Sequence, residues 1–238
     1  MTADGLWSYG LMVCTNRPEE YPMTTLDLTP DELLSTTRAV RKRLDFDRPV
    51  PRELIEECID LATQAPTGRN RQRWHFIVVT DRAKRRVVGD IFRRALAVGT
   101  GQPLTADDVW RMNYSPRSTE LVFDGLRYLA ENIHRVPAMV IPAIEGRTDR
   151  ASVEIQSGAW GSILPAVWSF MLAARARGLG TTWTSAQGPL ERELAAALGI
   201  PYDKVMLAAF IPLAYTLGTD FKPAVRVPRA QVLHWERW

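Results

Sequence analysis

The feature that most constrains the fold of this chain is a long uncharged stretch, Ile155 to Ala174. A stretch of this length could cross a membrane as a helix. It is, however, interrupted by small and polar residues, namely Gln156, Ser157, Gly158, Gly161, Ser162, Pro165 and Ser169. We therefore predict a helix over Gln156–Arg177 that is apolar on nearly all sides and buried in a core or a subunit interface. Gly178 should end it in the left-handed conformation.

The charge balance argues against a polyanionic partner. The chain of 238 residues has a formal net charge of only +3, with arginines clustered around 38–43, 69–73 and 82–86. No nucleic-acid motif accompanies these clusters, so a small phosphorylated ligand fits them better than a nucleic acid. We predict neither a nucleic acid nor a membrane as partner. A nucleic-acid-binding protein is the alternative, and it would be colourless and would bind DNA in a salt-dependent way.

The number and spacing of the cysteines and histidines do not indicate a metal site. Cys14 and Cys58 form no disulfide framework, which favours the reducing cytoplasm, and Cys58 lies in an apolar helical pattern typical of a core. His75, His134 and His234 share no metal-ligand spacing. The first residues do not have the pattern of a signal peptide.

Residues 1–28 are expected to form an irregular arm, and residues 29–238 one domain. Thr29, Pro30 and Glu32 form a capping-box pattern for a helix that runs into the arginines near residue 38. Pro51 should open a second helix with an apolar stripe. The members of that stripe are Leu54, Ile55, Cys58, Ile59 and Ala62.

The remaining chain alternates between strand and helix patterns. Strands are predicted over Trp74–Val79, Val136–Ile144, Thr181–Thr184 and Met206–Leu213, and helices over Asp81–Ala97, Glu120–Asn132 and Pro189–Leu198. Residues 98–118 are rich in glycine and proline and are predicted to be a variable insertion or lid. This order indicates an α+β fold or a three-layer sandwich with helices on both faces of a sheet.

Four motifs carry a family resemblance. They are Arg38-Ala39-Val40-Arg41, Ala65–Trp74, Arg177–Trp183, and Arg226-Val227-Pro228 with the ending His234–Trp238. Their sequences, order and spacing resemble the nitroreductase family of FMN-dependent NAD(P)H oxidoreductases, over roughly residues 30 to 238. Each motif alone is weak evidence for the family, whereas the four motifs in this order are specific for it.

The resemblance implies a fold and a reaction. The fold would be a three-layer α/β/α sandwich with a mostly antiparallel central sheet, assembled as a domain-entangled homodimer with two FMN sites at the interface. Hydride would pass from NAD(P)H through flavin N5 to a small electron-poor acceptor such as a nitroaromatic or a quinone. The protein would supply no catalytic side chain, although Arg41 would stabilise the reduced flavin electrostatically.

The resemblance also implies a set of cofactor-binding residues: Arg38, Ala39, Arg41, Thr67, Gly68, Asn70, Gln72, Gly180, Thr181 and Arg226. The guanidinium group of arginine can donate paired hydrogen bonds to phosphate oxygens. We expect Arg38 and Arg226 to bind the same FMN phosphate. Asn70 has the donors and acceptor that a flavin pyrimidine edge requires. A clamp for one phosphate favours FMN over FAD.

Each site residue also has an ordinary structural explanation. The arginines could be a solvated charge run at a helix end, Asn70 could bond its own backbone in a plain turn, and Gly178 could be a helix cap. The chain also departs from the family pattern, with Ala39 in place of serine, Arg73 in place of proline and Arg43 in place of an apolar residue. Arg73 would then line a cofactor or substrate channel.

Other functions remain open at this point. Within the same superfamily these are a dehalogenase, an enone reductase or a flavin destructase. A flavin-binding protein with little turnover is a further alternative.

Overall fold

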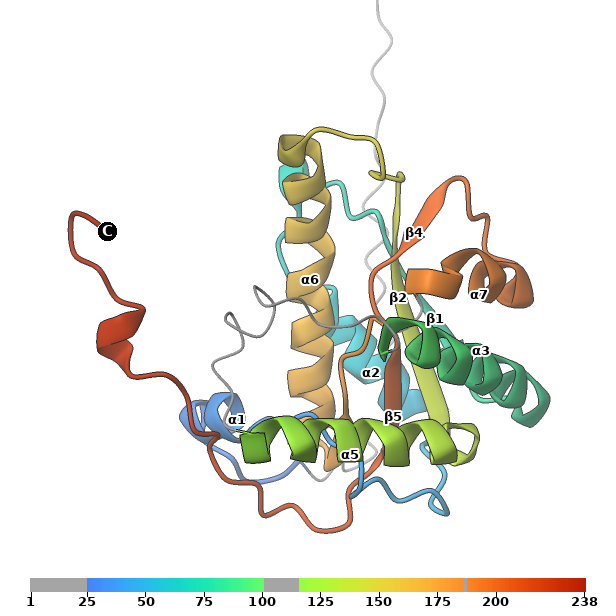
Figure 1. Cartoon of the computed structure of the whole chain (residues 1–238), viewed down its shortest axis with the longest axis horizontal. Coiled ribbons are helices and arrows are strands. Elements are labelled where there is room, and N and C mark those ends of the chain that lie inside the picture. The colour runs from blue at the N-terminus through green and yellow to red at the C-terminus, as the bar shows by residue number, and fades with distance from the viewer. Residues whose placement is uncertain (1–24, 101–115, 186–187) are drawn as a thin grey trace, which may run out of the picture.

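The computed structural model describes residues 25–100, 116–185 and 188–238 (Figure 1). The helices are α1 (Pro30–Thr36), α2 (Arg52–Ala62), α3 (Arg82–Thr100), α5 (Pro116–Asn132), α6 (Val153–Ala176) and α7 (Glu191–Leu198). The strands are β1 (Trp74–Val79), β2 (Ala138–Glu145), β3 (Leu179–Thr181), β4 (Val205–Leu207) and β5 (Ile211–Tyr215). Short 3-10 turns occur at Gly68–Asn70, Ile133–Arg135, Gly188–Leu190 and Arg229–Gln231.

The central sheet is antiparallel and lies between two helical layers. Strand β2 pairs with β1 along one edge and with β4 and β5 along the other, and β3 pairs with β5. Successive side chains of a strand point to opposite faces. Val140 and Ile144 accordingly pack with α2 and α6, whereas Met139 and Ile141 pack with α3, α5 and α7. The predicted three-layer sandwich with an antiparallel sheet is therefore confirmed (Figure 1).

Helix α6 is the predicted long apolar helix. The Ser152 hydroxyl caps it, and Gly178 follows its end with φ of +73°, as expected for a glycine after a helix. Its length and composition would allow a membrane span, but half of the apolar window is buried against α2 and the sheet. It is therefore a core helix. Its outer face, defined here as Gly161, Leu164, Trp168 and Leu172, is only partly covered, and Trp168 is 40% exposed.

The capping box at α1 forms as predicted. Thr29 Oγ1 accepts a hydrogen bond from the Glu32 N–H at 3.2 Å, and the Glu32 carboxylate accepts one from the Thr29 N–H at 2.8 Å. The prediction that this helix runs into the arginines was wrong, because α1 ends at Thr36. Arg38 therefore lies outside the helix, directly after the C-cap residue Thr37.

The predicted strand Met206–Leu213 is two strands, β4 and β5. Ala143 pairs with Leu207 and Val140 with Ile211, so residues 208–210 face only 141 and 142 of β2. The segment between β4 and β5 therefore has one residue more than the part of β2 that it faces, which is a β-bulge. The bulge lies opposite Pro142, which has no N–H to donate.

Other boundaries also differ from the predictions. Strand β3 is Leu179–Thr181 rather than Thr181–Thr184, although Thr184 forms an isolated bridge with Phe210. Most of the predicted insertion at 98–118 lies outside the described residues. Its described ends belong to α3 and α5 and are helical rather than irregular. The arm is described only from residue 25, where the Leu26 N–H donates to the Ala176 carbonyl.

The α2 stripe packs as predicted. Leu54, Ile55, Cys58 and Ala62 are buried, and Ile59 is half-buried. Burial raises the pKa of the Cys58 thiol to about 12, so this cysteine is a protonated core residue at neutral pH.

Candidate functional site

The first group of predicted site residues gathers beside β3. The Val40 N–H donates to the Thr181 carbonyl at 2.8 Å, and Ala39 forms a parallel bridge with Thr181. This bond holds the segment of Arg38, Ala39 and Arg41 against Gly180 and Thr181. The structure thus brings together two motifs that are far apart in the sequence. We call these five residues the arginine cluster.

Gly180 makes this close approach possible. A Cβ at this position would lie 2.7 Å from Thr216 Cγ2, 3.0 Å from Leu44 Cδ2 and 3.1 Å from Val40 Cβ. Any larger side chain would push the arginine-bearing segment away from β3. Packing therefore accounts for this glycine.

Arg41 has an unsatisfied buried donor. Its Nε is buried and has no hydrogen-bond partner within the described residues, and its side chain packs against Gly125 of α5. Burial lowers the pKa of this guanidinium, which nevertheless stays charged at neutral pH because arginine titrates so high. A buried cationic donor without a partner fits an anionic or carbonyl-bearing ligand.

Arg38 and Arg226 are connected only through the backbone of the C-terminal tail, residues 222–238. Arg38 is half-buried, and its Nη1 donates to the Lys222 carbonyl at 3.5 Å. Arg226 is exposed and contacts the carbonyl of its neighbour Val225 at 3.3 Å. The tail then extends away from the rest of the chain, and Trp238 is fully exposed (Figure 1).

The second group of predicted site residues forms the loop between α2 and β1. The Gly68 N–H donates to Ser162 Oγ of α6 at 3.1 Å. Gln72 donates from its side chain to Asn70 Oδ1 at 2.9 Å, and from its N–H to Thr67 Oγ1 at 3.2 Å. We call Thr67, Gly68, Asn70 and Gln72 the amide loop. Asn70 Oδ1 is thus held by a neighbouring side chain within the turn.

The amide loop is strained and adjoins a cavity. Arg69, Asn70 and Gln72 have φ of 56°, 52° and 49°, in the left-handed region that non-glycine residues avoid. Such strain costs of order 1 kcal/mol per residue and concentrates at functional sites. The adjoining cavity of about 280 Å³ is lined by the amide-loop residues Thr67, Gly68 and Gln72, by Arg73, and by α6 residues including Ile155, Gly158 and Ser162.

Within one chain the two groups lie at different levels of α6, the amide loop beside its middle and the arginine-bearing segment near its C-terminal end. The amide loop contacts Ser162, whereas Arg175 Nη2 donates to Thr36 Oγ1, two residues before Arg38. From Ser162 to Arg175 the helix advances by 13 residues, which is about 20 Å at 1.5 Å per residue. One chain therefore does not place all the predicted site residues around one pocket.

Comparison with known proteins identifies the family. Residues 34–215, which include three of the four motifs, match the model of the nitroreductase family. The chain belongs to the nitroreductase family. Its membership accounts for the order of the motifs and for the antiparallel three-layer fold.

Individual relatives differ in what they are named for. The chain is 28% identical to 5,6-dimethylbenzimidazole synthase of Rhodospirillum rubrum over 165 residues, 67% of this chain and 70% of that protein. It is 27% identical to 4-nitrobenzoate reductase of Nocardioides sp. over 209 residues, 78% of this chain and 79% of that protein. Both likenesses are too distant to transfer a substrate.

A solved structure shares the fold. The FMN and NADPH-dependent nitroreductase NfnB of a Sphigopyxis strain superposes with a TM-score of 0.64 at 21% identity, covering 89% of this chain and 100% of that one. FMN is thus bound by structural neighbours in this family. The donor set of this chain, with its orphaned Arg41 Nε and permanently charged Arg38, fits such a phosphorylated cofactor.

Ser162 is a site residue that sequence reasoning missed. Its hydroxyl donates to the Gly158 carbonyl at 2.8 Å and accepts from the Gly68 N–H. A serine within the long uncharged helix was the available signal, since a polar side chain that becomes buried needs a partner.

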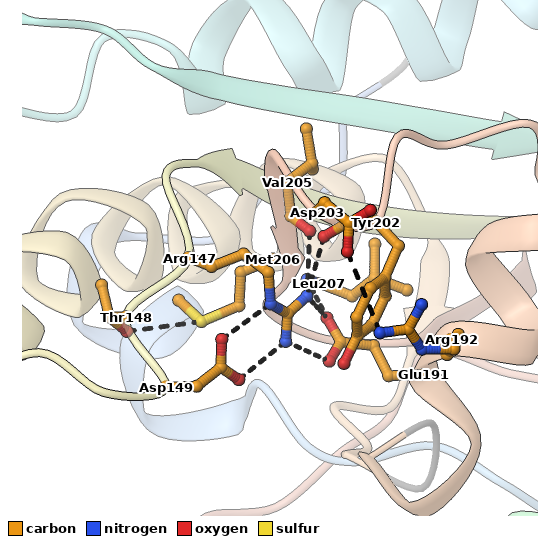
Figure 2. Close-up of polar contacts among 10 residues, drawn as sticks. All are labelled: Arg147, Thr148, Asp149, Glu191, Arg192, Tyr202, Asp203, Val205, Met206 and Leu207. Carbon is orange, nitrogen blue, oxygen red and sulfur yellow. Dashed lines mark hydrogen bonds and ion pairs between the residues drawn. The ribbon is translucent and has the colours of Figure 1, made fainter.

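The polar cluster around Arg147 is a structural brace rather than a binding site (Figure 2). All three guanidinium nitrogens of Arg147 are engaged, by Asp149, by Glu191 and by the carbonyls of Tyr202 and Val205. Glu191 also accepts from the Leu207 N–H at 2.8 Å. These bonds therefore fasten the loop after β2 to α7 and β4 and leave no guanidinium nitrogen of Arg147 free for a ligand.

Proposed function

We propose that this chain is an FMN-dependent oxidoreductase that takes hydride from NAD(P)H and passes it to an electron-poor organic acceptor such as a nitroaromatic or a quinone. The observation that carries the proposal is the separation of the arginine cluster and the amide loop along α6. Each group is half of a flavin site, and the partly covered apolar face of α6 lies between them.

A two-fold symmetric homodimer would complete the site. If the outer faces of two α6 helices pack across a two-fold axis that is perpendicular to the helices, the helices run antiparallel. The C-terminal, arginine-bearing part of one helix then lies beside the amide-loop half of the other. The same arrangement would cover Trp168 and give the extended C-terminal tail a surface to pack on.

Different residues of the site hold different parts of FMN. Arg38 and Arg41, with Arg226 from the tail, supply fixed cations for the phosphate and for a flavin carbonyl, and Ala39 and Thr181 position the first two. Asn70 and Gln72 offer amides to the ring edge, and Gly68 permits close backbone approach. When bound, FMN supplies the two-electron centre of the reaction, and the protein orients it and excludes water.

NAD(P)H as donor, a nitroaromatic as acceptor and a cytoplasmic location belong to this proposal. The first two are supported by the names of the relatives, and the third by the free buried Cys58.

Purification tests the proposal directly. The protein should be yellow and should release FMN, not FAD, on denaturation. The holoenzyme should then oxidise NADH or NADPH in anaerobic buffer only when 4-nitrobenzoate or a quinone is added. No flavin after reconstitution with FMN, or a flavoprotein without turnover on any acceptor, would contradict the assignment.

A synthase is the second candidate, because one relative carries the name 5,6-dimethylbenzimidazole synthase. Chromatography of the flavin after reduction and exposure to oxygen separates the two. A reductase returns FMN intact, whereas an enzyme that consumes its flavin does not. Adding a halogenated phenol and an enone to the acceptor panel tests the dehalogenase and enone-reductase alternatives.

A further inference from the structure

A cavity lies away from both halves of the proposed flavin site. It has a volume of about 680 Å³ and opens where β1 ends and β2 begins. Its lining consists of Phe46, Asp47, Pro49, Val50, Thr80, Arg82, Arg85, Arg86, His134, Arg135 and Pro137. This volume is within the range of small-molecule sites.

The cavity carries a strong excess of positive charge. Four arginines line it, and Asp47 is the one carboxylate in the lining. Asp47 is 91% exposed and lies 3.8 Å from Arg135. Arg82 and Arg86 have no ion pair within the described part of the chain. The positive potential inside the cavity is therefore left largely uncompensated.

Two of the arginines are held in place by the protein. Arg85 donates to the Thr80 carbonyl at 3.0 Å and to the Val136 carbonyl at 2.7 Å. Arg135 lies over the ring of Phe46 at 5.0 Å, and Phe46 in turn stacks on Tyr128. Burial, and secondly the charge of Arg82, lowers the pKa of Arg85, as expected for a cation near other cations. Guanidinium groups held in this way are preorganised for an anion.

The spacing of the arginines on α3 is unfavourable without a counter-charge. Arg82, Arg85 and Arg86 share one face of the helix, where like charges three and four residues apart repel. The nearby Asp81 is occupied as the cap of the first turn, accepting from the Lys84 N–H at 2.8 Å. An anion in the cavity would relieve this repulsion.

We propose that this cavity is a second binding site, for an organic phosphate of nucleotide size. The guanidinium groups of Arg82, Arg85 and Arg86 bind the phosphate, and the apolar wall of Phe46, Pro49, Val50 and Pro137 receives the organic part. None of these residues belongs to the arginine cluster or the amide loop, so the site is independent of the proposed flavin function.

Calorimetric titration with adenosine 5′-monophosphate (AMP) tests the site on the protein as purified, saturated with FMN. AMP should bind without changing the flavin absorbance, and neither adenosine nor inorganic phosphate should bind as tightly. Arg82→Ala and Arg86→Ala should each weaken AMP binding about tenfold, the loss of one charge-assisted hydrogen bond. Both side chains are exposed, so these variants should fold normally, which thermal unfolding would verify.

Lys84→Ala is the matched control, because Lys84 is an exposed cation on the same helix and is not part of the lining. AMP binding that Arg82→Ala and Arg86→Ala leave unchanged would overturn the proposal. Equal affinity for adenosine or for inorganic phosphate would overturn it as well. So would binding of duplex DNA, and not AMP, that depends on Arg82, since this would make the cavity part of a polyanion-binding surface.

Discussion

The backbone N–H of Gly68 donates to the hydroxyl of Ser162 at 3.1 Å, which fastens the amide loop to the middle of α6. The same hydroxyl is bonded to the Gly158 carbonyl, so its position is fixed by the helix. A loop with three non-glycine residues in the left-handed region needs such an attachment to hold its conformation.

Ser162→Ala should loosen this loop. The lost hydrogen bond is worth about 1 kcal/mol, so FMN affinity should fall about fivefold. Ser157→Ala is the matched control, because Ser157 bonds the helix backbone in a similar way and faces solvent. Fluorescence titration of the apoprotein with FMN measures both. Equal affinities in the two variants would show that Ser162 does not position the loop.

Gly180→Ala should damage both stability and cofactor binding. The added methyl group would overlap Thr216 Cγ2 and crowd Val40, displacing the arginine-bearing segment. Overpacking of this kind costs about 1–3 kcal/mol of unfolding free energy. Thr216→Ser removes the overlapping methyl group and keeps the hydroxyl that donates to the Gly178 carbonyl. Urea unfolding of the double variant should recover part of the loss, and no recovery would argue against this steric cause.

Arg147→Ala should be among the more destabilising changes at a charged residue. It would leave the half-buried Glu191 without its cation and two carbonyls without donors. We expect a loss of about 3 kcal/mol in the free energy of unfolding, as for broken buried pairs. Arg192→Ala, which breaks an exposed pair of 3.8 Å with Asp203, should cost less than about 1 kcal/mol. Similar losses by urea unfolding would contradict the role of Arg147 as a brace.

Sequence patterns correctly predicted the elements that are determined by residues adjacent in the sequence. The Thr29 capping box, the strand Trp74–Val79 and the end of α6 before Gly178 depend on neighbouring residues, and the sequence identified them correctly. The division of Met206–Leu213 into two strands could not be predicted in this way. It depends on Pro142 of β2, a residue distant in the sequence that faces the bulge.

The candidate site was predictable as a list of residues but not as an arrangement. Motif resemblance named both Arg41 and Asn70, but nothing local indicates that they lie at different levels of α6, about 20 Å apart along the helix. The packing of Gly180 against Thr216 and the bond between Gly68 and Ser162 are long-range contacts as well. The arginines at 82–86 were noticed as a charge cluster, but the cavity they line forms only when β1, β2 and α3 meet.

The outer face of α6 gives a test of the proposed dimer. Light scattering should give a mass near twice 26.8 kDa. Trp168→Glu would place a charge in the proposed interface and should yield a monomer that no longer retains FMN, since desolvating an unpaired carboxylate is costly. Val87→Glu, at an exposed apolar residue of α3, is the control and should stay dimeric. A wild-type monomer that still binds FMN would exclude a site shared between subunits.

The final prediction concerns Arg38 and Arg226, which we expect to hold the same FMN phosphate. Arg38 already contacts the tail at the Lys222 carbonyl, four residues before Arg226. Replacing either arginine with alanine should remove charge-assisted hydrogen bonds worth roughly 1.5–3 kcal/mol each, and so reduce FMN affinity at least about tenfold. The double variant should lose less than the sum of the two, because both side chains act on one ligand group.

The control variant for the Arg38 and Arg226 titrations must replace an arginine whose side chain makes no contact that stabilises the fold. Arg85 is unsuitable, since it donates to the Val136 carbonyl and lines the cationic cavity. Arg229 is exposed and lies in the same tail, so Arg229→Ala should leave FMN binding nearly unchanged. If titration with FMN shows Arg229→Ala weakening binding as much as Arg226→Ala, the tail arginines act only as a diffuse positive field. The phosphate clamp would then have to be built from Arg38 and Arg41 without the tail.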